Sequence, residues 1–277
     1  MIREFYTTSS AVCDIIKKKR FLLWEMSRLD LRDRYVGQAF GLFWAIFVPL
    51  LTMFVYLFVF AMVFKVKLSG TSGTGAGWGG SYALYLLSGL IPWMSLQEVL
   101  TRSSTIITGN ANLVKQVVFP LEVLPLKIFG PPLLTQGIAL VVYFTYGCLR
   151  FGAPGALVLA LPFVFVCQMF LSMGCALIFS SVGVFLRDIK DITGILCFLL
   201  VYALPIFYSP TMVPERFSLI LQCNPLTHMI TMYHDVLFFG QVTCWHSWYI
   251  FPAFAIAVWF IGCRTFEALK PFFGNVL

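Results

Sequence analysis

The three histidines of this sequence, His228, His234 and His246, are the first candidates for chemistry, because imidazole acts as a metal ligand and as a general acid or base. No pair of them has the i, i+4 spacing that places two histidines on one helix face for zinc. His234 and Asp235 form the one adjacent His and Asp pair. We therefore expect no metal site, and this pair is the feature that would favour a membrane-embedded enzyme.

Two glycine patterns bear on nucleotide binding. The P-loop motif G-x-x-x-x-G-K-[ST], which cradles ATP phosphates, is absent. Gly75, Gly77 and Gly80 match G-x-G-x-x-G, but they lie between two apolar runs and not in a βαβ unit, so a flexible linker is the better interpretation. We expect no catalytic residue and no cofactor in this chain. If transport is driven by ATP, a separate subunit binds the ATP and Mg²⁺.

Ionisable residues beside apolar runs are costly to bury and tend to mark partners or pathways. Glu98 and Arg102 lie four residues apart and can pair on one helix face. Glu122 and Lys127 flank the start of a later apolar run. A role in energy coupling and a role as interfacial residues that reach lipid headgroups both remain open.

The elements that position these residues are membrane helices. Hydrophobic residues make up 60% of the 277 residues, charged residues only 11%, and the mean hydropathy is +0.88. These values predict an all-α integral membrane protein with one transmembrane domain over residues 1–277. Six apolar segments are long enough to be spans, at about residues 39–64, 81–100, 121–149, 156–186, 192–208 and 247–263.

The basic residues fix the expected topology. The net charge is +7 and the pI about 9.0, but the Lys and Arg residues flank apolar runs, so we expect membrane topology and no nucleic acid. Six crossings place both termini on one side. With the termini in the cytoplasm, only Lys65, Lys67, Arg150 and Arg216 fall outside, which satisfies the positive-inside rule.

Two segments are not spans. Residues 1–38 form a basic lead-in, and within it residues 12–35 have the spacing of an amphipathic interfacial helix, which either offers a polar face to a cytosolic partner or only anchors the topology. Residues 209–245 are apolar but broken at Asn224-Pro225, which fits two short re-entrant helices or an amphipathic external loop. A disulfide between Cys223 and Cys244 is also left open.

Aromatic residues, 17% of the chain, follow helical stripes in the first and fifth apolar segments. Such stripes pack against lipid, against neighbouring helices or against the C–H faces of sugars.

The order of several motifs resembles the membrane subunit of ABC-2 type polysaccharide exporters, closest to the O-antigen branch. The motifs are LLWEMSRLDLRDRYVGQAFGLFWAIFVPLL, then SGLIPWMSLQEVLTRSSTIITGNANLVKQVVFPLEVLPL, then FLRDIKDI, then NPLTHMI. The resemblance covers nearly the whole chain. It implies a homodimer in the bacterial inner membrane that works with a nucleotide-binding ATPase subunit and exports a lipid-linked glycan.

The resemblance also implies roles for individual residues. The ATPase interface and coupling elements would include Arg28, Asp30, Arg32, Asn110, Asn112, Leu113, Lys115, Arg187 and Asp188. Candidate aromatic residues of the channel wall are Phe43, Trp44, Phe47, Tyr56, Phe198 and Tyr202. A candidate outer gate contains Asn224, Pro225 and His228.

Alternatives of other classes remain. Capsule and teichoic-acid permeases are near relatives of the O-antigen branch, and an ABC-2 exporter of a small hydrophobic molecule would share the fold. A membrane enzyme would need a polar catalytic cluster, and a structural scaffold would function without any ATPase.

Overall fold

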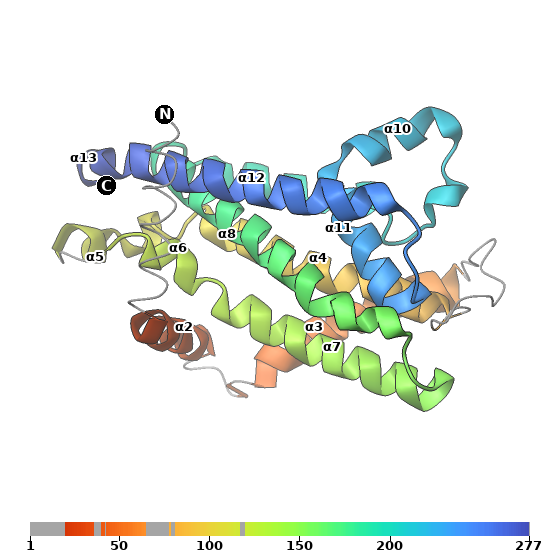
Figure 1. The fold of residues 1–277 in the computed structure, drawn as a ribbon. Coiled ribbons are helices and arrows are strands. Elements are labelled where there is room, and N and C mark those ends of the chain that lie inside the picture. The colour runs from red at the N-terminus through yellow and green to blue at the C-terminus, as the bar shows by residue number, and fades with distance from the viewer. Residues whose placement is uncertain are drawn as a thin grey trace.

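The computed structural model describes residues 20–35, 40–41, 43–64, 78, 81–116 and 120–276, all in helices, turns or irregular segments with no strand (Figure 1). Residues 1–19 of the predicted lead-in, most of the first outer loop and residues 117–119 lie outside this description. The longer helices are α2 (Arg20–Tyr35), α3 (Phe43–Leu57), α4 (Tyr82–Ser103), α7 (Gly130–Phe151), α8 (Leu161–Phe185), α9 (Ile189–Ala203), α10 (Glu215–Cys223), α11 (Pro225–His234) and α12 (Trp245–Leu269).

Shorter elements extend or join these helices. A π-helical turn continues α3, a second one continues α11, and 3₁₀ turns precede α5, α8, α10 and α13. Their bounds are η1 (Phe58–Val63), η2 (Thr108–Asn110), α5 (Ala111–Gln116), α6 (Val123–Lys127), η3 (Ala156–Ala160), η4 (Pro210–Met212), η5 (Asp235–Phe239), η6 (Lys270–Phe272) and α13 (Phe273–Val276).

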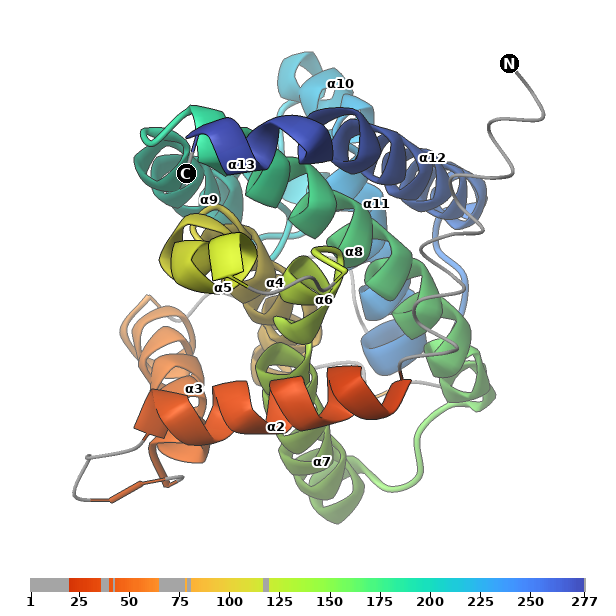
Figure 2. The ribbon, with the colours of Figure 1, turned by 90° about the vertical axis from the view of Figure 1, so that its left-hand side faces the viewer.

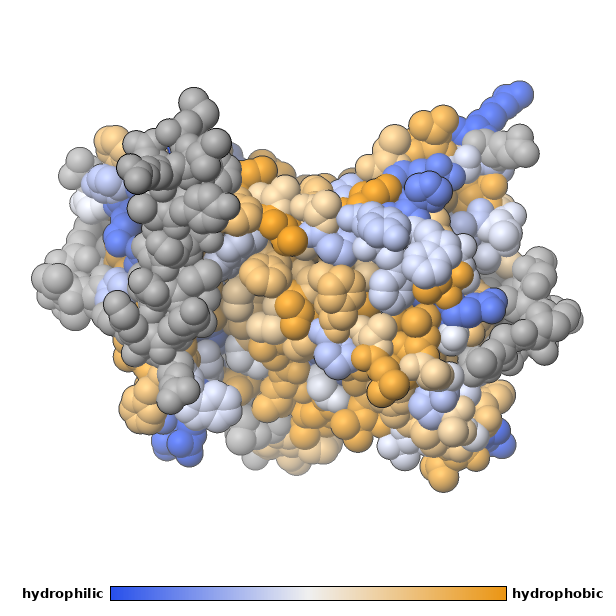
Figure 3. Space-filling model, viewed as in Figure 1, coloured by the Kyte–Doolittle hydropathy of each residue, from blue (hydrophilic) through white to orange (hydrophobic). Residues whose placement is uncertain are grey.

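Five of the described helical segments are long and apolar enough to cross a membrane. They are Ile46–Val63, Tyr82–Ser103, Val123–Phe151, Ala156–Phe185 and Trp245–Phe272. Hydrophobic residues cover the middle of the face in Figure 3, and hydrophilic residues gather toward its two ends. The chain is therefore a multi-pass membrane protein, as its composition predicted.

The fifth predicted segment, residues 192–208, differs from the prediction because its helix is short. Helix α9 ends at Ala203, and Leu204 is extended (φ −84°, ψ 149°) because the ring of Pro205 disfavours a helical conformation at the preceding residue. Fifteen helical residues cover only about 22 Å, less than the roughly 30 Å of a hydrocarbon core. Helix length alone therefore supports five spans and leaves the sixth unconfirmed.

Helices α8 and α12 cross where two glycines meet. A Cβ added to Gly174 would lie 2.5 Å from the carbonyl oxygen of Val258, and one added to Gly262 would lie 2.4 Å from that of Gly174. Small residues let membrane helices approach closely, which increases their van der Waals contact. Helix α4 packs against α8, and 16 of its 22 residues are buried.

The molecule has two ends of different construction. Helices α2, α5, α6 and α13 lie at one end, here called the α2 end, and α10 and α11 at the other, the α10 end (Figures 1 and 2). At the α2 end, the Ser27 hydroxyl donates to the carbonyl oxygen of Lys127 at 3.1 Å, which holds α2 against the start of the α6–α7 segment. The amphipathic helix expected before the first span is thus a real helix over the described residues.

The broken stretch 209–245 contains the two short helices α10 and α11, and their re-entry into the membrane stays a prediction. The Asn224 side chain accepts a hydrogen bond from the backbone N–H of Leu226 at 3.0 Å, and Pro225 is the first residue of α11, so the break is an N-cap followed by an N1 proline. Cys223 and Cys244 are both free thiols.

Candidate functional site

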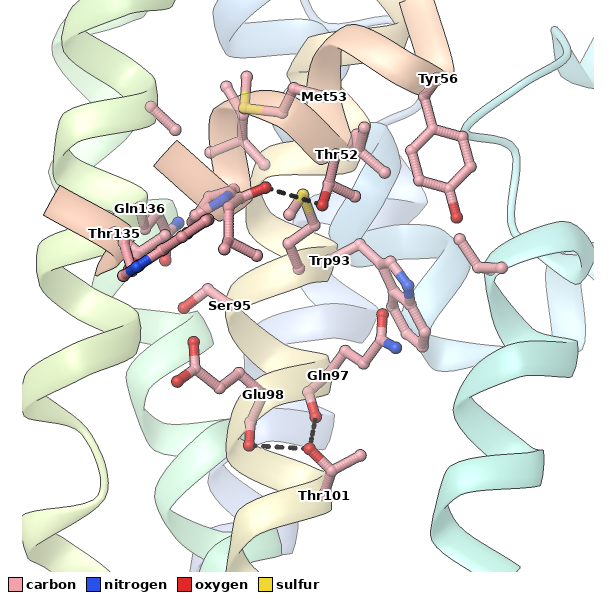
Figure 4. A pocket seen from close by; sticks show the side chains of 18 residues that line it. Thr52, Met53, Tyr56, Trp93, Ser95, Gln97, Glu98, Thr101, Thr135 and Gln136 are labelled. Carbon is pink, nitrogen blue, oxygen red and sulfur yellow. Dashed lines mark hydrogen bonds between the residues drawn. The ribbon is translucent and has the colours of Figure 1, made fainter. Parts of the chain in front are cut away.

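A cleft of about 770 Å³ lies between α3, α4 and α7 (Figure 4). Helix α4 forms its floor, α3 and α7 form its sides, and Val201 of α9 reaches its edge. The polar residues of its lining are Thr52, Ser95, Gln97, Glu98, Thr101, Thr135 and Gln136, and its aromatic residues are Trp44, Tyr56 and Trp93. A cleft that combines aromatic rings with hydroxyl and amide groups suits a ligand that has both apolar faces and hydrogen-bonding groups.

The structure brings two of the six predicted aromatic residues, Trp44 and Tyr56, to this cleft. It adds Trp93, which was not predicted as a cleft residue. A tryptophan within an apolar run does not show from the sequence alone whether its side chain faces a cleft, another helix or lipid. Trp93 is fully buried, and its indole N–H has no hydrogen-bond partner among the described residues. An unpaired N–H costs free energy in an apolar interior, so this group calls for an explanation.

Three polar residues of the cleft, Gln97, Glu98 and Thr101, lie near the α2 end of α4 (Figure 4). The Thr101 hydroxyl lies 2.9 Å from the carbonyl oxygen of Gln97 and 3.2 Å from that of Glu98, so it turns back onto its own helix (Figure 4). The Gln97 amide lies beside the Trp93 ring in the same view. This end of the cleft is therefore its hydrophilic end, with a carboxylate at the wall.

The other four predicted aromatic residues lie outside the cleft. Phe43 and Phe47 stack on each other with ring centroids 5.2 Å apart on the exposed side of α3. Phe198 and Tyr202 of α9 are also exposed, 63% and 49%, and contact each other with centroids 5.6 Å apart. These four rings are therefore exposed on the outside of the described chain, and they do not line the cleft.

The predicted ATPase-contact residues lie mainly at the α2 end. Arg28, Arg32, Asn112, Arg187 and Asp188 have exposed side chains. Lys115 lies within α5, and Leu113 of the same helix is half-buried. The Asn110 amide donates to the carbonyl oxygen of Ile106 at 2.7 Å, which makes it part of its own turn. Their role toward a partner stays a prediction.

Asp30 is the exception among these residues, because its carboxylate turns inward. It pairs with the guanidinium of Arg102 at the end of α4, while the i, i+4 pair of Arg102 with Glu98 has an N···O distance of 3.7 Å. Glu122, at the start of the third predicted span, accepts a hydrogen bond from the Lys270 ammonium at 2.6 Å. Neither Asp30 nor Lys270 could be found as a partner from sequence spacing, because both contacts are long-range.

At the α10 end, His228 is part of the fold. Its ring nitrogens lie 2.9 Å from the Ser247 hydroxyl and 2.9 Å from the carbonyl oxygen of Gln222. It therefore joins the end of α10 to the start of α12. The described residues contain no group of three His, Cys, Asp or Glu side chains that could hold a metal ion.

His234 and Asp235 are adjacent in sequence but have separate partners. The His234 ring lies 2.7 Å from the Ser88 hydroxyl and 3.0 Å from the carbonyl oxygen of Pro205. Burial lowers the pKa of His234 to about 4, so its ring is neutral at physiological pH. Asp235 accepts from the Thr243 hydroxyl at 2.5 Å and from the Trp248 indole at 2.9 Å. Both side chains are saturated and buried, so they form no catalytic pair.

Comparison with known proteins agrees with this architecture. Residues 22–238 match the family described as ABC-2 type transporter. An O-antigen export system permease protein RfbA of Klebsiella pneumoniae is 30% identical over 92% of this chain and 95% of its own length. An RfbA of Myxococcus xanthus is 22% identical over the same shares, and the polysialic acid transport protein KpsM of Escherichia coli is 24% identical over 86% of this chain and 89% of its own. This chain therefore belongs to the ABC-2 type transporter family.

Proposed function

We propose that this chain is the permease subunit of an ATP-driven exporter that moves a lipid-linked, O-antigen-like polysaccharide across the bacterial inner membrane. The observation that carries the proposal is the cleft on α4, which is lined by two tryptophans and a tyrosine together with hydroxyl and amide groups. Family membership and the names of the relatives over nearly full length support it.

The chemistry of the cleft suits sugars. Pyranose rings present apolar C–H faces to aromatic rings and hydroxyl groups to amides and carboxylates. Trp44 and Tyr56 would stack on successive sugars, while Gln97 and Glu98 would accept hydrogen bonds from the sugar hydroxyl groups. Aromatic walls impose no single orientation on a sugar, so a polymer can slide past them.

We infer that two copies assemble around the path. The exposed aromatic surface of α3 and α9, including Phe47 and Phe198, would face the second copy or its bound glycan. The sixth crossing would be α9 extended by residues 204–208, which places both termini in the cytoplasm under the positive-inside rule.

The ATPase subunit would bind at the α2 end. Arg28 and Arg32 on α2, together with the turn at Arg187, offer exposed charges for a protein partner. ATP and Mg²⁺ would belong to that partner. Movement of its surface would push α2 and α5 and tilt the spans as rigid bodies.

At the α10 end, α10 and α11 would enter the outer leaflet of the membrane and turn back near Asn224. This position makes the two helices candidates for a gate.

A second candidate substrate is a capsular glycan, because the chain also matches a polysialic acid transport protein. A small hydrophobic molecule is a poorer fit, since it would offer no polar group to the hydroxyl and amide groups of the cleft lining, such as the Gln97 amide.

The test is deletion of the permease in its host, with analysis of lipid-linked glycan on each side of the inner membrane. We expect the glycan to accumulate at the cytoplasmic face and to reach the surface again when the wild-type chain is restored. Normal surface glycan in the deletion strain would contradict the proposal, and loss of capsule with intact O-antigen would select the capsular alternative.

A further inference from the structure

A network of buried amide and hydroxyl groups runs from the cleft to helix α11. Gln136 of α7 lines the cleft and is 2% exposed. Its amide nitrogen donates to the Oε1 of Gln168 on α8 at 2.9 Å and to the hydroxyl of Tyr233 on α11 at 3.3 Å. The Tyr233 hydroxyl in turn donates to the same Oε1 of Gln168. A side chain of the cleft wall therefore contacts α11 directly.

The Gln168 amide closes this network and joins it to α4. Its nitrogen donates to the Oε1 of Gln136 at 3.2 Å and to the carbonyl oxygen of Pro92 at 3.2 Å. Gln168 is 3% exposed and Tyr233 is fully buried. In such an interior hydrogen bonds are strong and an unpaired polar group is costly, so a change of partner at one amide affects the others.

The bond between Gln136 and Tyr233 is the one that a ligand would break first. An amide nitrogen carries two hydrogens, and Gln136 directs one to Gln168 and one to Tyr233. A ligand oxygen that accepts from this nitrogen must replace one of these partners. The bond to Tyr233 is the longer of the two, and hydrogen bonds weaken with length. An apolar ligand has no accepting oxygen and would leave the bond in place.

The end of α11 that carries Tyr233 fits closely against α4. The ring of His234 stacks on the ring of Tyr85 with centroids 4.2 Å apart, and a Cβ added to Gly89 would lie 3.0 Å from the His234 Cε1. Helix α11 has ten residues, which corresponds to about 15 Å, so it moves as one unit. A change at Tyr233 therefore reaches the break at Asn224, where the helix begins.

We propose that Gln136 recognises a hydrogen-bond acceptor in the cleft, such as a sugar hydroxyl, and that Tyr233 transmits this recognition to α11. An accepting ligand draws the Gln136 amide away from Tyr233, and α11 is then held less tightly. The inference rests on the proposed function for its ligand, since a polysaccharide presents hydroxyl groups along its length. It makes Gln136 a specificity-determining residue and Tyr233 a positioning residue.

Two reagents of matched shape test this inference without any glycan. In the purified full-length chain, Thr135→Cys places a thiol beside Gln136 in the cleft (Figure 4). The reagents 2-hydroxyethyl methanethiosulfonate and propyl methanethiosulfonate then attach arms of equal length, one with a terminal hydroxyl and one with a terminal methyl group. Hydrogen–deuterium exchange of the α11 backbone amides measures how tightly this helix is held.

We expect the hydroxyethyl arm to raise the exchange rate of α11 roughly threefold to tenfold over the propyl arm, which is the effect of one lost hydrogen bond. Leu134→Cys is the matched control, because Leu134 is 44% exposed and lies outside the cleft lining. The two reagents should give equal exchange in this variant, which also corrects for their reaction with native cysteines.

Tyr233→Phe, combined with Thr135→Cys, should remove the difference between the two reagents, because the hydroxyl that Gln136 releases is gone. Gln136→Met keeps the length of the side chain without its amide and gives the same test if Tyr233→Phe does not fold. Equal exchange with both reagents in Thr135→Cys, or a difference that persists in Tyr233→Phe, would overturn the inference. Both outcomes leave the proposed function intact, because it is tested separately by the glycan of the deletion strain.

Discussion

Helices α3 and α4 face each other across the cleft, yet their surroundings differ sharply. Of the residues in the span Ile46–Val63, 6% are buried, whereas 16 of the 22 residues of Tyr82–Ser103 are buried. Both helices carry an internal proline, and both contribute an aromatic residue and a hydroxyl group to the cleft. The two helices also differ in composition, because the mean hydropathy is 2.5 for Ile46–Val63 and 1.2 for Tyr82–Ser103, so the more apolar helix is the one that the chain covers less.

Helix α4 is fixed along its whole length. Near its start, the Tyr85 hydroxyl donates to the carbonyl oxygens of Pro205 and Tyr208, at 3.2 Å and 2.9 Å. At its middle, the Gln168 amide donates to the carbonyl oxygen of Pro92 at 3.2 Å. Near its end, Ser104 lies against Gly183 of α8. This wall of the cleft is positioned by the chain itself.

Helix α3 contacts the chain on one side only. Its other side exposes large apolar residues such as Phe54, Val55 and Phe58, at 59%, 49% and 48%. In a bilayer such a surface is covered by lipid or by another copy. The comparison indicates a fixed wall on α4 and a wall on α3 whose position depends on what lies outside the subunit.

The largest predicted effect comes from Gly183→Ala at the fixed wall. The added methyl group would lie 2.0 Å from the carbonyl oxygen of Ser104, and backbone cannot move aside cheaply. We expect the free energy of unfolding in detergent to fall by about 3 kcal/mol. Gly137→Ala on α7 is the control, because nothing lies within 4 Å of its added methyl group. Equal stability of the two variants would show that α4 is not tightly packed against α8.

The second prediction concerns the buried amide that links α4 to its neighbours. Gln168 contacts Pro92, Gln136 and the hydroxyl of Tyr233, so Gln168→Leu leaves several buried polar groups unpaired. We expect a loss of about 2 kcal/mol in the free energy of unfolding. Thr145→Val, whose hydroxyl bonds only to its own helix at an exposed site, should change it little. A neutral Gln168→Leu would contradict the role of α4 as the fixed wall.

The third prediction is functional. Trp93→Phe keeps the ring but removes the indole N–H, which has no partner within the described chain. If a sugar hydroxyl accepts from this N–H during export, the variant should export about fivefold more slowly, which corresponds to roughly 1 kcal/mol, with unchanged thermal stability.

Trp78→Phe is the contrasting control for that experiment. Its indole donates to the carbonyl oxygen of Gly152 at 3.0 Å, so the loss should appear in thermal stability and not in the export rate. Wild-type export by Trp93→Phe would remove this residue from the glycan path.

The smallest effect is expected on the outward face of α3. Phe54→Leu should change the stability of the detergent-solubilised monomer by no more than about 0.5 kcal/mol, because the ring contacts little of the chain. The measurement is thermal unfolding of the monomeric fraction. A large loss there would mean that α3 packs against the subunit on both sides.

Much of the fold could be predicted from the sequence, because long apolar runs and breaker residues act locally. The spans, the helix before the first span and the break at Asn224 all follow from such signals. The early end of α9 was missed, although Pro205 was visible, because the apolar run continues past it to Tyr208. Hydropathy does not distinguish a helix from an extended apolar segment.

The candidate site was less predictable, because its contacts join residues far apart in sequence. Trp44 and Tyr56, two of the aromatic residues predicted for the channel wall, line the cleft, whereas Phe198 lies on an outward face, since a helical stripe gives periodicity without direction. The pairing of Glu98 with Arg102 was visible as an i, i+4 spacing. The stronger partner, Asp30, is 72 positions away and could be found only in three dimensions.

The most direct test of the central claim is export by the permease and its ATPase in reconstituted vesicles, with the cleft open or filled. Lipid-linked glycan is placed in the outer leaflet, and its protection from an added glycosidase is followed after ATP is supplied. The account predicts ATP-dependent protection by the wild-type complex and none by Thr135→Trp, which fills the cleft, while this variant still hydrolyses ATP. Equal protection by Thr135→Trp and the wild-type complex would show that glycan does not pass through this cleft.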